Sequence, residues 1–438
     1  MEIGVFPMSS PLDQTMRVHL PGNAVNLRQR QWEKLRTLMY RTAKTDNFNT
    51  RRFKEHGIDP FSIHTLEDYI RRIPFTAKGD LLNDRLAHPP FGTNFTEPLD
   101  RYTRFCQTTG TATGQPMAVL DTPASWETML ACWRQVYRAA GIKAGDRIFF
   151  AFSFGPFLGF WTAFEAAARD CLVLPGGGLS SQARLEMMAR YNATALCCTP
   201  TYALRLGESI GAPSGVNLNQ LSVKRIIVAG EPGGSLPTTR ERIRQLWGGA
   251  KLFDHHGMSE VGPVSYEDPE MPASLCVIED CYFAEVVDSA GNEVPDGSEG
   301  ELILTTLDRS ACPLFRYRTG DWVCKKVFND RLYLEGGVLS RCDDMVVIRG
   351  VNIYPSAIEN IVLRYPEIAE FQIEQHKVEN MDEVTLTVEL AAGVDDSLLH
   401  RLQDRLRDTF SLRIPVKLAP QGSLPRFEFK AKRWHKVL

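Results

Sequence analysis

The sequence lacks the features that mark a membrane-spanning, secreted or nucleic-acid-binding chain. No apolar run reaches the roughly 20 residues that a helix needs to cross a bilayer. The first thirty residues contain no charged start followed by an apolar stretch, so we expect no signal peptide. Positive charge is not in excess, because 50 Lys and Arg face 53 Asp and Glu, whereas nucleic-acid binders usually carry a basic surplus. We expect a cytoplasmic protein that binds neither a membrane nor a nucleic acid.

Cysteine is present, but not in a pattern that predicts disulfides or a metal centre. The ten cysteines contain no CxxC pair, and without a secretory signal we expect reduced thiols. Cys197 and Cys198 are adjacent in the apolar run "TALCCTP", so we expect both in the core.

The chain is long enough for two or three domains, with 438 residues of which 43% are hydrophobic. Near the start, Trp32, Leu35 and Met39 recur at helical spacing. Further along, strand-like runs alternate with helix-like segments such as "SQARLEMMARYN". This alternation predicts an α/β fold with mostly parallel strands, which binds ligands beyond the carboxyl ends of the strands. The strand-like runs are "RIFFAF" (147–152), "CLVLPGGG" (171–178), "ALCCTP" (195–200) and "RIIVAGEP" (225–232).

The predicted secondary structure changes twice after residue 270. "CYFAEVVDSAGNEVPDGSEGELILTTL" predicts strands joined by tight turns, and hence a β-rich subdomain. In the last hundred residues "DMVVIRGVNIYP" and "TLTVEL" are strand-like, while Leu398, Leu402, Leu406 and Phe410 mark one face of a helix. We therefore expect a small α+β domain at the C-terminus, with its boundary in the polar segment "SRCDDM" (340–345).

One loop, "QTTGTATGQP" (107–116), is typical of a phosphate-binding turn. Gly110 and Gly114 allow close approach of backbone N–H groups to an anion, and four threonines add hydroxyl donors. No lysine follows as in a Walker loop. An ordinary Gly/Thr turn is the alternative interpretation.

Four further segments could carry chemistry, and each alone also has a plain structural explanation. "AGEPGG" (229–234) follows a strand and could place backbone groups against a planar ligand, or be a simple turn. In "FDHHGMSEVG" (253–262) two adjacent histidines point to opposite faces of a strand, which disfavours a shared metal. That block suits a stacking role for His256 and a Mg²⁺-ligand role for Glu260. Asp321 in "FRYRTGDWV" could accept hydrogen bonds from a ribose diol, and Lys430 closes the series.

In this order and spacing, the segments resemble the adenylate-forming acyl-CoA synthetase superfamily and, within it, the phenylacetate–CoA ligase family. The strongest match is "SRCDDMVVIRGVNIYPSAIENIV" (340–362), and "GIDPFSIHTLEDYIRRIPFTAKGDL" (57–81) matches the family's beginning. The resemblance implies an adenylation domain over 1–341 that holds the acyl and ATP sites. It also implies a hinge at 342–344 and a mobile lid domain over 345–438. The implied reaction forms an acyl adenylate from ATP and an acid, and then transfers the acyl group to coenzyme A.

The resemblance also assigns residues. It implies catalytic roles for Glu260, Arg341 and Lys430, a Mg²⁺-ligand role for Glu260, and a hinge role for Asp343. Acid-binding residues are Phe152, Phe154, Gly155, Phe157 and Ala229. Nucleotide-binding residues are Thr108, Thr109, Gly110, Thr111, Thr113, Gly114, Gln115, Gly230, Glu231, Pro232, Asp254, His255, His256, Gly257, Met258, Ser259, Asp321 and Arg341.

This chain departs from the family at three of these places. Gln115 stands where the loop lysine is usual, His256 replaces a tyrosine, and Phe429 replaces a glycine. The sequence does not favour the structural zinc of some relatives, because Cys276, Cys281 and Asp268 do not make four ligands at workable spacing.

Three functions stay open at this stage. The first is an acyl-CoA ligase for an aromatic or arylalkyl acid, favoured by the aromatic segment "FSFGPFLGFW", although a buried helix start explains that segment equally well. The second is an adenylating enzyme that loads a carrier protein or an amine. The third is a degenerate nucleotide-binding protein, against which Glu260, Asp321 and Lys430 speak. The sequence is also compatible with a homodimer.

Overall fold

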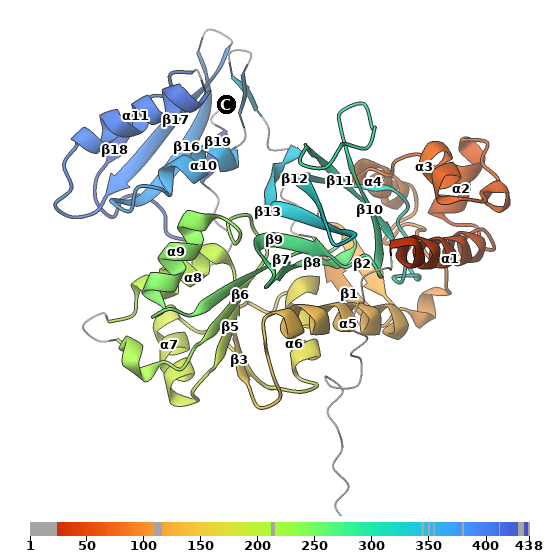
Figure 1. Cartoon of the computed structure of the whole chain (residues 1–438), viewed down its shortest axis with the longest axis horizontal. Helices are drawn as coiled ribbons and strands as arrows, with labels where there is room; N and C mark the ends of the chain where they lie inside the picture. The colour runs from red at the N-terminus through yellow and green to blue at the C-terminus, as the bar shows by residue number, and fades with distance from the viewer. Residues whose placement is uncertain are drawn as a thin grey trace, which may run out of the picture.

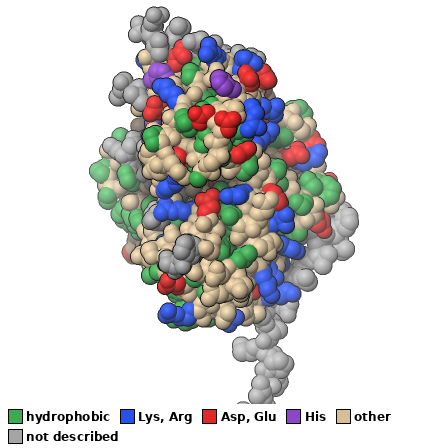
Figure 2. Space-filling view, turned by 90° about the vertical axis from the view of Figure 1, so that its left-hand side faces the viewer, with side chains coloured by type: hydrophobic (Ala, Val, Ile, Leu, Met, Phe, Trp, Pro, Cys, Tyr) green, Lys and Arg blue, Asp and Glu red, His purple; other side chains and the backbone are tan. Residues whose placement is uncertain are grey.

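The computed structural model describes residues 24–108, 116–211, 215–342, 346–348, 351–353, 355–378, 381–410, 412–427 and 433–436. These residues form a large N-terminal part and a smaller C-terminal sheet with its own helices (Figure 1). On the face in Figure 2, basic and acidic side chains are interspersed rather than segregated. Within the described ranges, no helix combines the length and the apolar character that crossing a membrane requires.

The N-terminal helices pack against the β-rich end of the large part. The predicted first helix is confirmed, and Leu35 and Met39 are fully buried against Phe283 and Phe315. The helices are α1 (Ala24–Thr42), α2 (Phe48–Glu55), α3 (Leu66–Arg72) and α4 (Lys78–Ala87). The start of α4 is capped by the Asp80 carboxylate, which accepts a 2.9 Å hydrogen bond from the Ala77 N–H.

An 11-stranded sheet forms the centre of the large part, in the order β10-β11-β12-β13-β9-β8-β7-β6-β5-β3-β4. The four strand-like runs of the sequence are confirmed as strands, and they pair in parallel. They are β3 (Arg147–Phe150), β4 (Leu172–Pro175), β5 (Ala195–Cys198) and β6 (Arg225–Val228). The helices between and beside them are α5 (Pro123–Ala139), α6 (Leu158–Ala167), α7 (Ser181–Arg190), α8 (Pro200–Glu208) and α9 (Pro237–Leu246).

The β-rich subdomain is continuous with the parallel strands, which the sequence did not indicate. The connection is β7 (Lys251–Met258), whose first half pairs in parallel with β6 and whose second half pairs antiparallel with β8 (Gly262–Asp268). The change of partner falls between Asp254 and His255, inside the block that carries the predicted site. The remaining strands are β9 (Met271–Val277), β10 (Tyr282–Val287), β11 (Glu299–Thr306), β12 (Tyr317–Phe328) and β13 (Arg331–Arg341).

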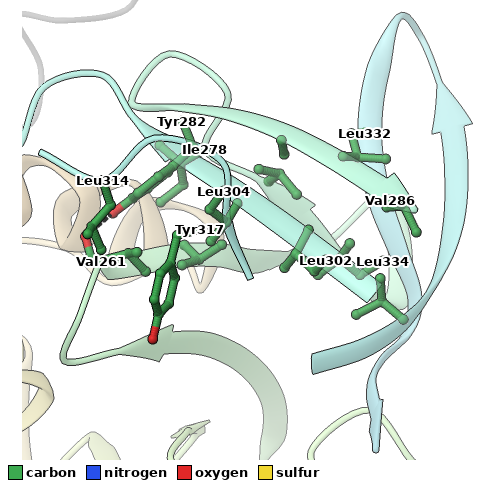
Figure 3. Close-up of a cluster of buried hydrophobic side chains, with 14 of the residues drawn as sticks. Val261, Ile278, Tyr282, Val286, Leu302, Leu304, Leu314, Tyr317, Leu332 and Leu334 are labelled. Atoms are coloured by element: carbon green, nitrogen blue, oxygen red, sulfur yellow. Dashed lines mark hydrogen bonds between the residues drawn. The ribbon is translucent and has the colours of Figure 1, made fainter. Parts of the chain in front are cut away.

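Apolar side chains fill both faces of this sheet. Figure 3 shows the cluster under the β-rich strands, where Leu302, Leu304 and Leu334 are fully buried. Cys197 and Cys198 are buried as predicted, and all ten cysteines lie in the described ranges as free thiols.

The C-terminal part confirms the predicted α+β pattern. Its four-stranded sheet has the order β18-β17-β16-β19, and Leu398, Leu402 and Leu406 of its second helix are buried against it. The elements are β14 (Val346–Ile348), β15 (Val351–Ile353), α10 (Pro355–Val362), β16 (Ile368–Val378), β17 (Met381–Leu390), α11 (Ser397–Phe410), β18 (Val416–Ala419) and β19 (Trp434–Lys436). The expected hinge residue Asp343 lies outside the described residues, so the domain boundary stays a prediction.

Candidate active site

The Thr/Gly loop is joined to a two-stranded hairpin at its base. β1 (Arg104–Gln107) pairs antiparallel with β2 (Ala118–Asp121). Thr108 N donates to Met117 O at 2.9 Å, and Met117 N donates to Thr108 Oγ1 at 2.9 Å, which closes the base. The predicted phosphate contacts in the loop itself lie outside the described residues and stay predictions. They are Thr109, Gly110, Thr111, Thr113, Gly114 and Gln115.

Glu260 lies in the turn between β7 and β8, and its carboxylate is paired with a lysine from the first part of the chain. Nζ of Lys78 is 3.0 Å from Oε1 of Glu260, and the two side chains are 27% and 8% exposed. Glu260 lines a pocket together with Met117 and Ala118, the residues that leave the Thr/Gly loop. A cation and an anion therefore lie at the foot of the predicted phosphate loop.

Asp321 is held between a histidine and an arginine. Its Oδ2 is 2.9 Å from Nε2 of His256, and its Oδ1 accepts a 2.8 Å hydrogen bond from Nη1 of Arg341. Burial opposes ionisation of this carboxyl, but the two neighbours outweigh it and lower the pKa of Asp321. Three residues assigned to the nucleotide from separate segments thus come together.

Tyr317 links this group to Glu260. Figure 3 shows its ring beside the leucines of the hydrophobic cluster, with the hydroxyl pointing away from them. Burial raises the pKa of Tyr317 well above its ordinary value, and the charge of the nearby Glu260 carboxylate adds to the rise. The same hydroxyl experiences the charges of Arg341 and Asp321, so it lies within electrostatic range of all three side chains.

The GEP turn lies at the carboxyl end of β6, where parallel sheets bind ligands. Gly230 has a φ of +96°, a conformation that glycine adopts without strain. Oε1 of Glu231 accepts a 2.8 Å hydrogen bond from the Thr201 N–H at the start of α8. The structure therefore gives the Glu231 carboxylate a capping contact, and Pro232 follows it in the same turn.

Asp254 and His255, both assigned to the nucleotide, have buried side chains with other partners. Ser235 Oγ donates a 2.7 Å hydrogen bond to Asp254 Oδ2, and burial raises the pKa of Asp254 to about 6. His255 Nδ1 is 2.7 Å from Ser265 O, and its ring lies 4.3 Å from that of Trp133. Burial lowers the pKa of His255 to about 3. His255 and His256 face opposite sides of β7, as expected, and only His256 reaches Asp321.

The three residues before Glu260 shape its turn. A Cβ atom at Gly257 would lie 2.8 Å from the Gly262 carbonyl oxygen, so glycine permits the close approach of β7 and β8. Met258 packs partly buried against the hydrophobic cluster. Ser259 contributes its carbonyl to a hydrogen bond from Arg309 at 2.9 Å.

The aromatic segment predicted for the acid lies between β3 and α6. The Phe152 and Phe160 rings stack at 4.1 Å, and the Phe154 ring meets Trp161 edge-on at 5.3 Å. Phe154 has a φ of +54°, which a bulky side chain rarely adopts. The Gln107 N–H donates a 2.7 Å hydrogen bond to Pro156 O, so this segment adjoins the base of the Thr/Gly loop. The other predicted acid contacts are Gly155 and Phe157 in this segment and Ala229, whose N–H donates to Cys198 O at 3.1 Å.

The late lysine, Lys430, lies outside the described residues, as does Phe429. The nearest described residue after them is Arg433, whose Nε donates a 2.7 Å hydrogen bond to Glu370 Oε1. Glu231 also acts on Arg433 electrostatically and contributes to raising its pKa against the effect of burial. Arg433, just before β19, is therefore within electrostatic range of the GEP turn.

The residues around Glu260 fit a magnesium ion bound with a nucleotide. Mg²⁺ is usually held by one or two carboxylates and by phosphate oxygens, and Glu260 offers one carboxylate beside the Thr/Gly loop. At the positions that correspond to the zinc site of some relatives, Cys276 is fully buried and Asp268 accepts a 2.8 Å hydrogen bond from the Tyr333 hydroxyl. In the described part of the chain, no three His, Cys, Asp or Glu side chains group as metal ligands.

Comparison with known proteins decides the family. The AMP-binding enzyme profile matches residues 88–306, and the AMP-binding enzyme C-terminal domain matches residues 350–436. Phenylacetate-coenzyme A ligase of Pseudomonas putida is 31% identical over 418 residues, with 92% of this chain and 93% of that protein covered. The chain belongs to the phenylacetate–CoA ligase family of AMP-binding enzymes. The enzyme of the same name from Thermus thermophilus is 32% identical, with 92% and 94% covered.

A solved relative confirms the fold of this family member. 2-Hydroxyisobutyryl-CoA ligase in its postadenylation state matches with a TM-score of 0.89 at 26% identity, with 99% of this chain and 96% of that chain covered. The same protein in its thioesterification state matches with a TM-score of 0.72 at 26% identity, covering 100% and 96% of the two chains. The α/β architecture with a large N-terminal domain and a small C-terminal domain is thus the architecture of a CoA ligase.

Sequence analysis did not single out Lys78, the lysine that lies beside Glu260. It belongs to the segment "PFTAKGDL", and a lysine at the start of a helix is usually solvated. Only the fold brings it to Glu260.

Proposed function

We propose that this chain activates a carboxylic acid with ATP and transfers the acyl group to coenzyme A. An oxygen of the acid attacks the α-phosphorus, the bond to pyrophosphate breaks, and an acyl adenylate forms. The sulfur of coenzyme A then loses its proton and attacks the acyl carbon, and the C–O bond to AMP breaks. The observation that carries the proposal is the convergence of two charged groups around Tyr317. One is the Lys78–Glu260 pair at the base of the Thr/Gly loop, and the other is His256–Asp321–Arg341.

The first step brings one anion to another, so it requires preorganised positive charge. Lys78 lies beside Glu260, at the base of the Thr/Gly loop, and supplies one cation in a chain whose loop lacks the usual lysine. Glu260 would hold a magnesium ion, and that ion would neutralise further charge on the phosphates. Lys430 reaches the reacting groups from the lid domain in this proposal, which fits the proximity of Arg433 to Glu231.

Asp321 binds the ribose in this proposal. Both of its oxygens are already hydrogen-bonded, to His256 and Arg341, so its charge and direction are set before the nucleotide arrives. A carboxylate oxygen has lone pairs to spare for a hydroxyl donor. His256 lies beside it at the place of the family's tyrosine and flanks the base together with the GEP turn.

The acid is aromatic or arylalkyl in this proposal. Phe152, Phe154 and Phe157 lie in one segment next to the phosphate-loop base, and aromatic rings offer a flat apolar contact surface. The family's phenylacetate ligases are consistent with this substrate class, while the solved 2-hydroxyisobutyryl ligase represents the alternative of a small aliphatic hydroxy acid.

The test is acid-dependent exchange of labelled pyrophosphate into ATP, screened over arylacetates, benzoates and short aliphatic acids. We expect exchange with an aryl acid and acyl-CoA formation only after coenzyme A is added. If exchange is normal but no thioester forms when coenzyme A is added, the acceptor is a carrier protein or an amine. Absence of exchange with every acid, in a protein that still binds ATP, would overturn the proposed reaction. Lys430→Ala should abolish exchange, whereas Lys436→Ala, in the last strand of the same domain, should not.

A further inference from the structure

A buried arginine, Arg309, connects the two sides of the candidate site. It lies in the loop between β11 and β12 and is 3% exposed. Its Nε and Nη2 atoms donate to the two carboxylate oxygens of Asp121 at 2.8 and 2.5 Å. Its Nη1 atom donates to the carbonyl oxygens of Ser259 and Glu260 at 2.9 and 2.7 Å. One guanidinium thus joins the strand that leaves the Thr/Gly loop to the turn that carries Glu260.

The two carbonyls belong to the peptide groups on either side of the Glu260 Cα atom. Each peptide group is planar, so the orientations of the two groups that flank the Cα atom define φ and ψ of Glu260. Holding both carbonyls with one nitrogen therefore fixes the direction in which the Glu260 side chain leaves the backbone. The next carbonyl of the turn, that of Val261, accepts a 2.8 Å hydrogen bond from the buried Tyr282 hydroxyl.

Asp121 ties the same guanidinium to the phosphate loop. It is the last residue of β2, four residues after Met117 closes the loop base. Asp121 is 1% exposed, and a buried charge pair is rigid only when its geometry satisfies both partners. The bidentate contact meets this condition and holds the hairpin at a fixed distance from the Glu260 turn.

We propose that Arg309 is a positioning residue that orients the Glu260 carboxylate relative to β2, the strand that begins at the base of the Thr/Gly loop. This proposal rests on the proposed function, since it takes Glu260 as the ligand of the nucleotide-bound Mg²⁺. Arg309 acts through backbone carbonyls and touches neither the substrate nor the metal.

The chain provides a matched control in Arg316. Its guanidinium also makes a bidentate contact with a buried carboxylate, Glu285, at 3.1 and 2.8 Å. It also donates to two backbone carbonyls, those of Ile70 and Ile73. These carbonyls belong to the end of α3 and the residue after it rather than to the Glu260 turn. Arg316→Lys should therefore reproduce the structural loss of Arg309→Lys without reorienting Glu260.

The experiment compares Arg309→Lys, Asp121→Asn, Arg316→Lys and Glu260→Gln with the wild type. ATP binding is measured calorimetrically at increasing Mg²⁺, without any acid, together with urea stability. We expect Arg309→Lys to raise the half-saturating Mg²⁺ concentration about tenfold, because a lysine cannot make all four contacts and a small misplacement is costly. Asp121→Asn should shift it in the same direction by less, and serves if Arg309→Lys does not fold. Glu260→Gln removes the carboxylate charge itself, so it shows how far the Mg²⁺ requirement rises when the ligand is lost completely.

The outcomes separate the two proposals. If Arg309→Lys and Asp121→Asn change the Mg²⁺ requirement no more than Arg316→Lys does at similar loss of stability, Arg309 is merely structural and the inference is overturned. A wild type that binds ATP with Mg²⁺ but catalyses no acid-dependent exchange overturns the proposed function alone. A wild type whose ATP binding does not respond to Mg²⁺ overturns both.

Discussion

Nζ of Lys78 lies 3.0 Å from Oε1 of Glu260, although one residue begins a helix of the N-terminal segment and the other closes a turn of the central sheet. The contact places a cation where the resemblance implies only an acidic metal ligand. It also bears on the missing loop lysine, because the positive charge can come from a distant part of the chain. The Glu260 carboxylate pairs with Lys78, and in the proposed reaction it would also hold the metal.

We predict that Lys78→Met weakens adenylation. The charge-assisted contact of a lysine with a phosphate or carboxylate contributes about 1.5–3 kcal/mol, so pyrophosphate exchange should fall roughly 10- to 100-fold in kcat/KM for ATP. Lys34→Met is the control, because Lys34 also forms an ion pair, a more exposed one, with Asp308 at 2.6 Å. An equal loss of activity in both variants would show that the effect is on folding rather than on the site.

Gln115→Lys should lower the KM for ATP more than it changes kcat. A charged donor makes hydrogen bonds about twice as strong as a neutral amide does, and the loop contacts of the nucleotide form before the chemical step. Steady-state kinetics with varied ATP tests this, with Gln135→Lys on α5 as the control for added charge. An unchanged or increased KM would show that Gln115 does not face the phosphates.

A third prediction concerns stability at mild acid. Burial lowers the pKa of His255 to about 3, whereas an unfolded histidine titrates near 6.5. Between these values the unfolded chain binds a proton that the folded chain does not, so stability falls as the pH falls below about 6.5. Each pH unit in this window removes about 1.4 kcal/mol, or roughly 2 kcal/mol between pH 6.5 and 5. Burial raises the pKa of Asp254 to about 6, so this residue has the opposite effect. As the pH falls, the folded chain binds a proton at Asp254 before the unfolded chain does, which stabilises the folded state.

Replacing the histidine isolates its contribution. In urea titrations followed by tryptophan fluorescence, His255→Gln should reduce the loss of unfolding free energy between pH 7 and pH 5 by about 2 kcal/mol. His88→Gln, which removes an exposed histidine, should leave the loss unchanged. If the two variants show the same pH dependence, His255 is not held neutral in the folded protein.

Much of the fold could be predicted because its signals are local. The runs "RIFFAF" and "ALCCTP" are apolar because their strands are covered on both faces, and the opposite faces of His255 and His256 follow from strand geometry alone. The continuity of the two halves of the sheet could not be predicted, since it depends on β7 changing partners in mid-strand.

Contacts between distant segments account for what was missed at the site. Arg309 and Asp121 are 188 residues apart, and nothing in the spacing of "DRSACP" distinguishes a buried arginine from a solvated one. The family resemblance assigned Asp254 and Glu231 to the nucleotide. The fold shows that their carboxylates also have structural partners, Ser235 and the Thr201 N–H.

The last prediction concerns the acid. Phe154 adopts a left-handed backbone conformation with φ of +54°, which costs a non-glycine residue roughly 1–2 kcal/mol. Its ring packs edge-on against Trp161 and Phe164 at 5.3 and 5.2 Å. If this ring contacts the acid, Phe154→Ala should raise the KM for an aryl acid about tenfold or more, since burying an aromatic ring contributes about 1.5–3 kcal/mol. The KM for ATP should be unchanged.

Phe154→Gly separates contact from strain, because it removes the same ring and also relieves the backbone. Equal rises in the acid KM for both variants would identify the ring as the determinant. A normal acid KM in the alanine variant would place the acid elsewhere, and a rise in the alanine variant alone would assign the effect to the backbone.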